Sequence, residues 1–286
     1  MINRWGKLMT AKLDVNVNAF WENGYTIIRN VYSRDEINGF REAAYASRGR
    51  GLGDLLANPL MRSTLVDGNF VAIARQILGS DDIWYSGDSS FTINSGQRGF
   101  HKDNVDRQDP GGPDWKGRYT ILRFGIYLQD HWRHTGGLNL RAKSHNTADH
   151  SYGKNVYVRT RVGDVVVWSL RTTHSGNGVL LKFPRWVHPE PSEIPKIPAW
   201  RIAKADGDRI AVFAALGLDD AHHDRYAEYL KTRTYMVNSF RASHYDDEAL
   251  AAAEKAGLKV RDMAKEIEGD DSVGKNAKWE PLPYGN

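Results

Sequence analysis

The sequence predicts a mainly β domain with flanking helices, built around an antiparallel sandwich or jelly roll. Three observations lead to this prediction. The composition is globular, with 41% hydrophobic and 11% aromatic residues among 286. Short runs rich in β-branched and aromatic residues recur between Ile83 and about Leu216, separated by clusters of Gly, Asp, Asn and Pro. The segments before and after this region have helical patterns instead.

The first eighty residues are expected to form helices that support the sheet. Three helices are predicted, over residues 15–23, 33–46 and 70–78. Each is preceded by an N-terminal capping signal: Asp14, the capping box of Ser33 and Glu36, and Asp67. Gly24 and Gly79 are expected to end the first and third helices. The β-formers of residues 25–31 predict one strand within this region.

Six β-rich runs predict the strands of the core, residues 81–217: residues 83–87, 90–95, 119–128, 155–162, 164–170 and 209–216. Residues 182–208 contain five prolines and interrupt this pattern. Such long irregular insertions are usually functional, so we expect a lid or a mobile segment here. Residues 218–286 are expected to form helices and a polar tail, and the chain 1–286 a single domain.

Composition excludes several classes of function. The chain has no cysteine, which rules out disulfides, thiolate metal sites and a cysteine nucleophile. Its net charge of +4 is spread along the chain, without the basic run of a nucleic-acid or membrane patch. No signal core and no stretch of about 20 apolar residues is present. We therefore expect a cytoplasmic protein that acts on a small molecule, and the sequence contains no signal for an oligomeric state.

Three His-x-Asp pairs are candidates for a metal site: His101–Asp103, His222–Asp224 and His244–Asp246. A non-haem Fe(II) site needs two imidazoles and one carboxylate on one face of the metal, with the other positions open. On a jelly roll, the first His and the Asp follow one strand, and the second His comes from a strand much later. Only the first pair follows a predicted strand and precedes several more. The other two pairs are expected on solvated helix faces.

The second imidazole is expected at His174, which follows the predicted strand 164–170. The small residues Ser175 and Gly176 come directly after it and allow close approach of a ligand. A rival pair, His188 and Glu190, lies in the proline-rich insertion, which is a poor rigid platform. The sequence therefore predicts a metal site formed by His101, Asp103 and His174.

At these residues the chain resembles the phytanoyl-CoA dioxygenase family of Fe(II)/2-oxoglutarate-dependent oxygenases. Four segments carry the resemblance, in order along residues 80–217: FHKD at 100–103, GGLNLRAKSH at 136–145, GDVVVW at 163–168 and HSGN at 174–177. The chain departs from the family at Lys143, where a Gly usually precedes Ser-His. The insertion after His174 is also longer than the family norm.

The resemblance implies a double-stranded β-helix (jelly-roll, cupin-like) core that holds Fe(II) through His101, Asp103 and His174. It implies 2-oxoglutarate and O2 as cosubstrates, with release of succinate and CO2. Halogenating relatives have a small residue in place of the carboxylate, so Asp103 favours hydroxylation or desaturation of a substrate C–H bond. The alternative from another class is a cupin-like metal-binding or isomerase protein, with Zn(II) or no metal, that does not use 2-oxoglutarate.

The family also implies an arginine that pairs with the distal carboxylate of 2-oxoglutarate, because the planar guanidinium binds a carboxylate through two hydrogen bonds. Arg185 has the usual family spacing from His174, whereas Arg209 begins the next predicted strand. We prefer Arg209, because placement on a strand fixes the direction of the side chain. Ser175 is assigned to the same cofactor site.

Two further residues are candidates for substrate binding. Alternation along residues 119–128 places Arg123, Gly125 and Tyr127 on one face of a strand. If that face is interior, the charge of Arg123 requires an anion, which the substrate or cosubstrate can supply. Lys102 lies between two predicted ligands and is expected to point toward substrate.

Overall fold

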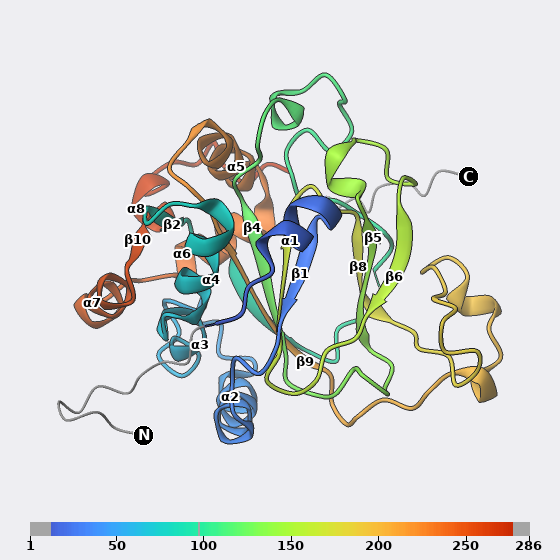
Figure 1. Ribbon diagram of the computed structural model, residues 1–286. Helices are drawn as coiled ribbons and strands as arrows, with labels where there is room; N and C mark the ends of the chain where they lie inside the picture. Colours follow the sequence, from blue (N-terminus) through green and yellow to red (C-terminus); the bar gives the residue numbers. More distant parts are fainter. Residues whose placement is uncertain (1–12, 97, 277–286) are drawn as a thin grey trace.

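Two antiparallel sheets form the centre of the computed structural model, which describes residues 13–96 and 98–276 (Figure 1). The larger sheet has the strand order β1 (Tyr25–Ile28), β7 (Val165–Ser169), β4 (Leu122–Tyr127), β9 (Ile210–Leu216) and β3 (Ser89–Ile93). The smaller sheet has the order β6 (Lys154–Val158), β5 (Gly137–Ala142) and β8 (His174–Gly178). Side chains from both sheets form one buried cluster, so the sheets face each other as in a jelly roll.

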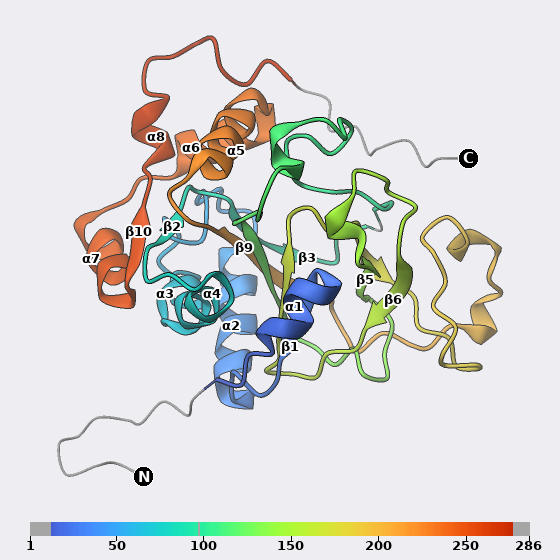
Figure 2. The ribbon, with the colours of Figure 1, turned by 45° about the horizontal axis from the view of Figure 1, so that its top comes forward.

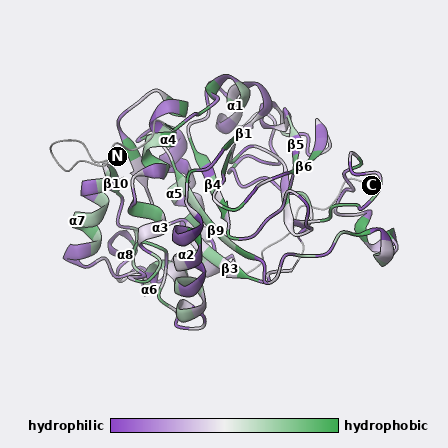
Figure 3. Ribbon diagram, turned by 60° about the horizontal axis from the view of Figure 1, so that its bottom comes forward, coloured by the Kyte–Doolittle hydropathy of each residue, from purple (hydrophilic) through white to green (hydrophobic). Residues whose placement is uncertain are grey.

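The larger sheet is buried on both faces. In β7, Val165 and Val167 pack into the cluster that contains the N-terminal helices, whereas Val166 and Trp168 pack toward the smaller sheet. Successive side chains of a strand point to opposite faces, so a strand covered on both sides is apolar at every position. Figure 3 shows this contrast, with β4 and β9 largely hydrophobic and the outer helix α2 largely hydrophilic.

Helices cover the outer face of the larger sheet (Figure 2). They are α1 (Val17–Asn23), α2 (Arg34–Ser47), α3 (Ser63–Val66) and α4 (Asn69–Leu78). The predicted capping box of Ser33 and Glu36 is confirmed at α2, and Gly24 and Gly79 end α1 and α4 in the left-handed conformation as predicted.

Two of the predicted caps were wrong. Asn16, rather than Asp14, caps α1, because its side chain accepts a hydrogen bond from the Ala19 backbone N–H. At α4 the N-cap is Gly68, and the Asp67 carboxylate instead accepts from the Asn69 backbone N–H at 2.8 Å. In both cases a neighbouring residue, one or two positions along the chain, starts the helix.

The C-terminal region packs beside the larger sheet and returns to the N-terminal half. It contains α5 (Ala221–Thr232), α6 (Thr234–Ala242), α7 (Asp247–Ala256), β10 (Leu258–Val260) and α8 (Met263–Glu266). Strand β10 was not predicted; it pairs in parallel with β2 (Ile83–Tyr85). Most of the predicted polar tail and the N-terminal segment lie outside the described residues. No helix in the described ranges is long and apolar enough to cross a bilayer.

The insertion at residues 182–208 lies beyond the smaller sheet, on the side away from the helices (Figures 1 and 2). It contains two short 3-10 turns, Ile194–Lys196 and Ala199–Arg201. Three polar contacts hold it to the smaller sheet: Asn139 Nδ2 to Pro189 O at 2.9 Å, Asn155 Nδ2 to His188 O at 2.7 Å, and Arg141 to Glu190 at 2.6 Å. The insertion is therefore anchored to the outside of the jelly roll.

Candidate metal centre

Backbone pairing brings the two predicted histidines side by side. His101 and His174 exchange both backbone hydrogen bonds, at 3.0 and 2.8 Å, and the Asp103 N–H donates to Leu170 O at 3.0 Å. This short antiparallel bridge joins the loop before β4 to the first residue of β8. The imidazole centroids are consequently 4.3 Å apart.

Hydrogen bonds to backbone carbonyls orient both imidazoles. His101 Nδ1 is 2.8 Å from Gly99 O, and His174 Nδ1 is 3.0 Å from Thr172 O. A carbonyl can only accept, so each Nδ1 carries the proton and each Nε2 keeps its lone pair. This is the usual arrangement around a metal-binding histidine.

The carboxylate of Asp103 lies between the two Nε2 atoms. Its oxygens are 3.9 Å from His101 Nε2 and 3.6 Å from His174 Nε2. One donor atom from each of the three residues lies within 4.8 Å of the others. Among the described residues, this is the one group of three or more His, Asp or Glu side chains that can reach a single metal ion. The structure thus brings together the three residues predicted as ligands.

Electrostatics favour the metal-binding protonation states. Burial, and then the charge of the neighbouring His101, lower the pKa of His174 to about 3; burial also lowers the pKa of His101. Burial opposes ionisation of Asp103, but the charges of His174, Arg123 and His101 outweigh it and lower the pKa of that carboxyl. At neutral pH the site therefore offers two neutral imidazoles and one carboxylate.

Arg123 pairs with carboxylates of the protein itself. Its Nη2 lies 2.8 Å from Asp88 Oδ2 and 3.2 Å from Asp103 Oδ2, and Tyr226 donates a hydrogen bond to Asp88. The predicted alternation is confirmed, because Arg123 and Tyr127 both face the interior cavity. Asp88 and Asp103 therefore supply the negative charge that Arg123 requires, and Arg123 in turn fixes the orientation of Asp103.

A cavity of about 390 Å³ opens between the sheets at the metal centre. Its wall includes Asp88, Tyr127, Leu138, Trp168, Phe213 and Tyr235, in addition to the three candidate ligands. The apolar and aromatic side chains come from both sheets and from α6. Many of the other lining side chains are polar or charged, so one wall of the cavity is apolar and the other can pair with polar groups of a small molecule.

Arg209 lies in this cavity, directly before β9, and is 7% exposed. Its Nε donates to Gly136 O at 2.6 Å and its Nη1 to Ser95 Oγ at 3.0 Å. No carboxylate of the described residues lies within 4.0 Å of it. The Tyr127 ring is 5.6 Å away, and the buried Tyr127 hydroxyl has no acceptor for its own proton within the described part of the chain.

The structure places three other predicted site residues away from the cavity. Arg185 is exposed on the insertion and does not line it. Ser175 is buried, with its hydroxyl bonded to Arg98 O, so it anchors a loop and does not face a cofactor. The Lys102 ammonium points away from the cavity and donates to Ser144 O at 2.6 Å and Arg171 O at 2.7 Å.

The ammonium of Lys102 therefore does not point toward a substrate in the main cavity, contrary to the expectation. Adjacent residues in extended backbone point to opposite sides, so a residue between two inward-facing ligands faces the protein on the other side. Burial, and then the charge of Arg171, lower the pKa of Lys102 to about 7. The side chain connects the loop at residue 102 to the segments at residues 144 and 171.

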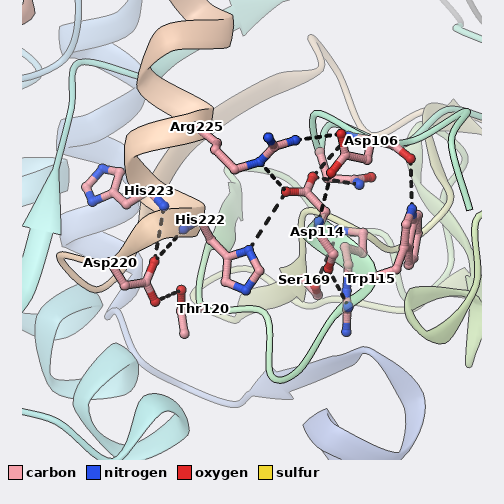
Figure 4. A network of polar contacts seen from close by, with 11 residues as sticks. Asp106, Asp114, Trp115, Thr120, Ser169, Asp220, His222, His223 and Arg225 are labelled. Atoms are coloured by element: carbon pink, nitrogen blue, oxygen red, sulfur yellow. Dashed lines mark hydrogen bonds and ion pairs between the residues drawn. The ribbon is translucent and has the colours of Figure 1, made fainter. Parts of the chain in front are cut away.

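The rival His-x-Asp pairs have structural roles. His222 belongs to a polar network with Asp114, at 3.8 Å, which also includes Asp106 and Arg225 (Figure 4). It is only 15% exposed, so the expected solvated position was wrong for this residue. Asp246 caps α7. Neither pair joins a third metal-binding side chain in the described ranges.

The insertion 182–208 contributes no residue to the wall of the cavity. The expected lid over the site is therefore not formed by this segment in the structure. The cavity wall near Arg209 comes instead from Ser95, Gly96 and Arg98, which the sequence did not single out. Asp88 was also missed, because an isolated Asp in a Gly- and Ser-rich turn carries no signal of its own.

No protein-family profile and no curated protein matches the sequence. Solved structures do match, with 270 chains in all. One is EctD of S. alaskensis with 2-oxoglutarate and 5-hydroxyectoine, at 17% identity, with a TM-score of 0.52 and coverage of 74% of this chain and 78% of that chain. Another is SnoN, a non-heme α-ketoglutarate-dependent epimerase from nogalamycin biosynthesis, at 16% identity, with a TM-score of 0.51 and coverage of 71% and 81%.

A third similar structure is HygX from Streptomyces hygroscopicus with nickel and 2-oxoglutarate bound. It is 16% identical, with a TM-score of 0.50 and coverage of 71% of this chain and 85% of that chain. At these identities the likeness shows the fold. The chain has the double-stranded β-helix core with flanking helices that the sequence predicted.

Proposed function

We propose that this protein is a non-haem Fe(II)/2-oxoglutarate-dependent oxygenase with Fe(II) held by His101, Asp103 and His174. The observation that carries the proposal is that donor atoms of two imidazoles and one carboxylate lie within 4.8 Å of one another, while both Nδ1 atoms are hydrogen-bonded to backbone carbonyls. Two imidazoles and one carboxylate with open positions are the donor set of this enzyme class. The solved structures that share the fold include proteins crystallised with 2-oxoglutarate.

The cavity also fits 2-oxoglutarate. Arg209 is a buried cation without a carboxylate partner among the described residues, and the Tyr127 O–H beside it lacks an acceptor. A carboxylate placed between them would satisfy both groups, and two parallel hydrogen bonds to the guanidinium would fix its direction. We assign the distal carboxylate of the cosubstrate to this position.

When bound, Fe(II), 2-oxoglutarate and O2 supply the oxidising chemistry. The residues of the chain position these groups: Arg123 holds the Asp103 carboxylate, and the two carbonyl hydrogen bonds keep both imidazoles in the ligating tautomer. Trp168, Phe213 and Leu138 give the cavity an apolar wall beside these polar groups. The carboxylate at position 103 favours hydroxylation or desaturation of a small molecule.

The finer assignment is a member of the phytanoyl-CoA dioxygenase-like family, folded as one domain over residues 1–286. The segments FHKD, GDVVVW and HSGN support this assignment. A metal-dependent release of succinate from 2-oxoglutarate distinguishes it from a cupin-like isomerase. Binding of zinc without succinate release would favour that alternative.

The metal assignment is tested by five alanine variants. His101→Ala, Asp103→Ala and His174→Ala should each lose stoichiometric Fe(II) and 2-oxoglutarate-dependent succinate release, because a facial triad retains little affinity after one ligand is lost. His222→Ala and His244→Ala are the matched controls and should retain both. Iron content is measured by mass spectrometry after anaerobic loading. Full loading of His174→Ala would show that the ligand set is wrong.

A further inference from the structure

A second, smaller pocket adjoins the metal centre. Its volume is about 40 Å³, and it shares walls with the main cavity at His101, Asp103, Arg123 and Tyr235. The rest of its wall is formed by Lys102, Arg107, Tyr226, Tyr229, Leu230 and Arg233. We call it the arginine pocket. It lies where α5 and α6 meet the loop that carries the candidate ligands.

Arg233 is the buried charge of this pocket. It lies between α5 and α6 and is 4% exposed, and its buried Nε has no hydrogen-bond partner within the described ranges. The contacts of its guanidinium are with aromatic rings, 5.7 Å from the Tyr229 centroid and 5.7 Å from that of Tyr235. A buried guanidinium that has no anion or carbonyl partner in the described part of the chain is costly, so it indicates a missing ligand.

Arg107 places a second positive charge beside the Tyr229 ring. Its guanidinium lies 5.0 Å from the Tyr229 centroid, and its Nη1 donates to Asn104 O at 3.2 Å. No carboxylate of residues 13–96 and 98–276 lies within 4.0 Å of Arg107 or Arg233. Arg225 of α5 differs from these two arginines, because its guanidinium forms an ion pair with the Asp106 carboxylate at 2.6 Å. Two cations at one aromatic ring repel each other unless an anion lies near both.

We propose that the arginine pocket binds an oxyanion group of the substrate, a carboxylate or a phosphate, through Arg107 and Arg233. A buried water molecule needs about 10–15 Å³ of cavity volume. The arginine pocket therefore has room for about three waters, which is about the size of one carboxylate or phosphate group. The shared wall with the metal centre then places the adjoining carbon atoms of the substrate at the metal. This substrate role rests on the proposed function, whereas anion binding does not.

The arginine pocket is distinct from the site assigned to 2-oxoglutarate. Arg209 lines the main cavity and is absent from the wall of the arginine pocket, and Arg107 and Arg233 do not line the main cavity. Two cationic positions thus flank the metal centre, one for the cosubstrate and one for the substrate. An acidic substrate would be held at the side of the centre that faces α5 and α6.

The anion site is tested on the metal-free protein with inorganic phosphate and with acetate as probes. Arg233→Met keeps the apolar contact with Tyr229 and removes the charge; Arg107→Met is the second variant. Arg241→Met, at an exposed position of α6, is the matched control. Calorimetric titration should give phosphate or acetate affinities at least tenfold weaker for both pocket variants, and an unchanged affinity for the control.

Thermal unfolding distinguishes an anion-binding role of Arg233 from a purely structural one. In buffer without oxyanions, Arg233→Met should melt at a higher temperature than the parent protein, because it removes an uncompensated buried charge. Added phosphate should raise the melting temperature of the parent by more than that of Arg233→Met, in which only the Arg209 position is left to bind an anion. If Arg233→Met lowers the melting temperature and binds phosphate as the parent does, the proposal is wrong.

The substrate role is tested on the Fe(II) protein with 2-oxoglutarate. Short carboxylic acids and phosphate monoesters should trigger succinate release, and the matching methyl esters should not; the more effective series identifies the anion. Arg233→Met should need at least tenfold more acid, and Arg241→Met the same amount as the parent. Equal responses to acids and esters would overturn the substrate role. If Arg233→Met loses affinity for 2-oxoglutarate itself, the pocket holds the cosubstrate instead.

Discussion

Arg123 and Arg209 both line the central cavity, but their surroundings assign them different tasks. Arg123 is neutralised by Asp88 and Asp103, so it serves the carboxylate of the proposed metal site. Arg209 bonds to a carbonyl and a hydroxyl, which fix its direction, and no carboxylate of the described residues compensates its charge. An uncompensated, oriented guanidinium is suited to a carboxylate ligand.

Arg209→Ala should therefore weaken 2-oxoglutarate binding by about thirtyfold or more, because the loss of one partner of a buried charged pair costs about 2–5 kcal/mol and each ~1.4 kcal/mol is tenfold. Iron content should not change. Arg209→Lys should restore part of the affinity, since it keeps the charge and loses the second hydrogen bond. The measurement is titration of 2-oxoglutarate into anaerobic Fe(II) protein.

Arg185→Ala is the control for this experiment, because Arg185 is exposed on the insertion. Its affinity for 2-oxoglutarate should equal that of the parent protein. The reverse result, in which Arg185→Ala loses affinity and Arg209→Ala keeps it, would mean that the insertion rearranges over the cavity and that the usual family spacing applies.

Individual residues were predictable where a strand fixed their direction. His101, Asp103 and His174 were identified from their places relative to predicted strands, and Arg209 was preferred over Arg185 for the same reason. Lys102 and Ser175 were assigned by their nearness to a ligand in the sequence, which says nothing about which way a side chain points. Arg107 and Arg233 gave no signal, because their common pocket exists only after α5 packs beside the loop at residue 107.

Whole elements were predictable where their own residues favour them. The six β-rich runs correspond to β2, β3, β4, β6, β7 and β9, although most observed strands are shorter. Strands β5 and β8 were missed, because GLNLRA and HSGNG contain few β-formers. Pairing with β6 and with each other holds them extended, and such tertiary context overrides local propensity.

The insertion is the element whose expected role changed most. Because three contacts anchor it to the smaller sheet and none of its residues lines the cavity, we expect its hydrogen exchange to be the same with and without 2-oxoglutarate. The loop that contains Ser95, Gly96 and Arg98 lines the cavity and should gain protection instead. Hydrogen-exchange mass spectrometry of the Fe(II) protein compares both segments in one experiment.

The loop residues Ser95, Gly96 and Arg98 act as an internal control in that measurement. Protection that appears in the insertion and not in this loop would restore the lid interpretation. Protection in neither segment would place the cosubstrate outside the cavity and contradict the assignment of Arg209.

One hydrophobic core connects the ends of the described chain. It contains Phe20 of α1, Phe124 of β4 and Leu258 of β10. We therefore expect residues from α1 to β10 to unfold together. Leu258→Ala should lower the free energy of unfolding by about 2–5 kcal/mol, as for other buried leucines. It should shift the transition followed by tryptophan fluorescence and the one followed by circular dichroism by the same amount.

Coincident transitions in the parent protein and the variant would support a single cooperative domain. Two separate transitions, of which Leu258→Ala shifts only one, would instead show that the chain consists of independently stable parts. The parallel pairing of β10 with β2 argues for the first outcome, because it joins the C-terminal helices to the N-terminal half.

The bridge between His101 and His174 also has a topological consequence. A metal ion bound there ties together two points that are far apart along the chain, and so closes a large loop that includes four strands of the jelly roll. A cross-link that closes a loop of this size lowers the entropy of the unfolded chain. For a disulfide, this effect stabilises the folded state by about 4 kcal/mol. The chain has no cysteine and so no disulfide. The proposed iron would therefore also cross-link the chain, and loss of iron would lower the stability of the fold as well as the activity.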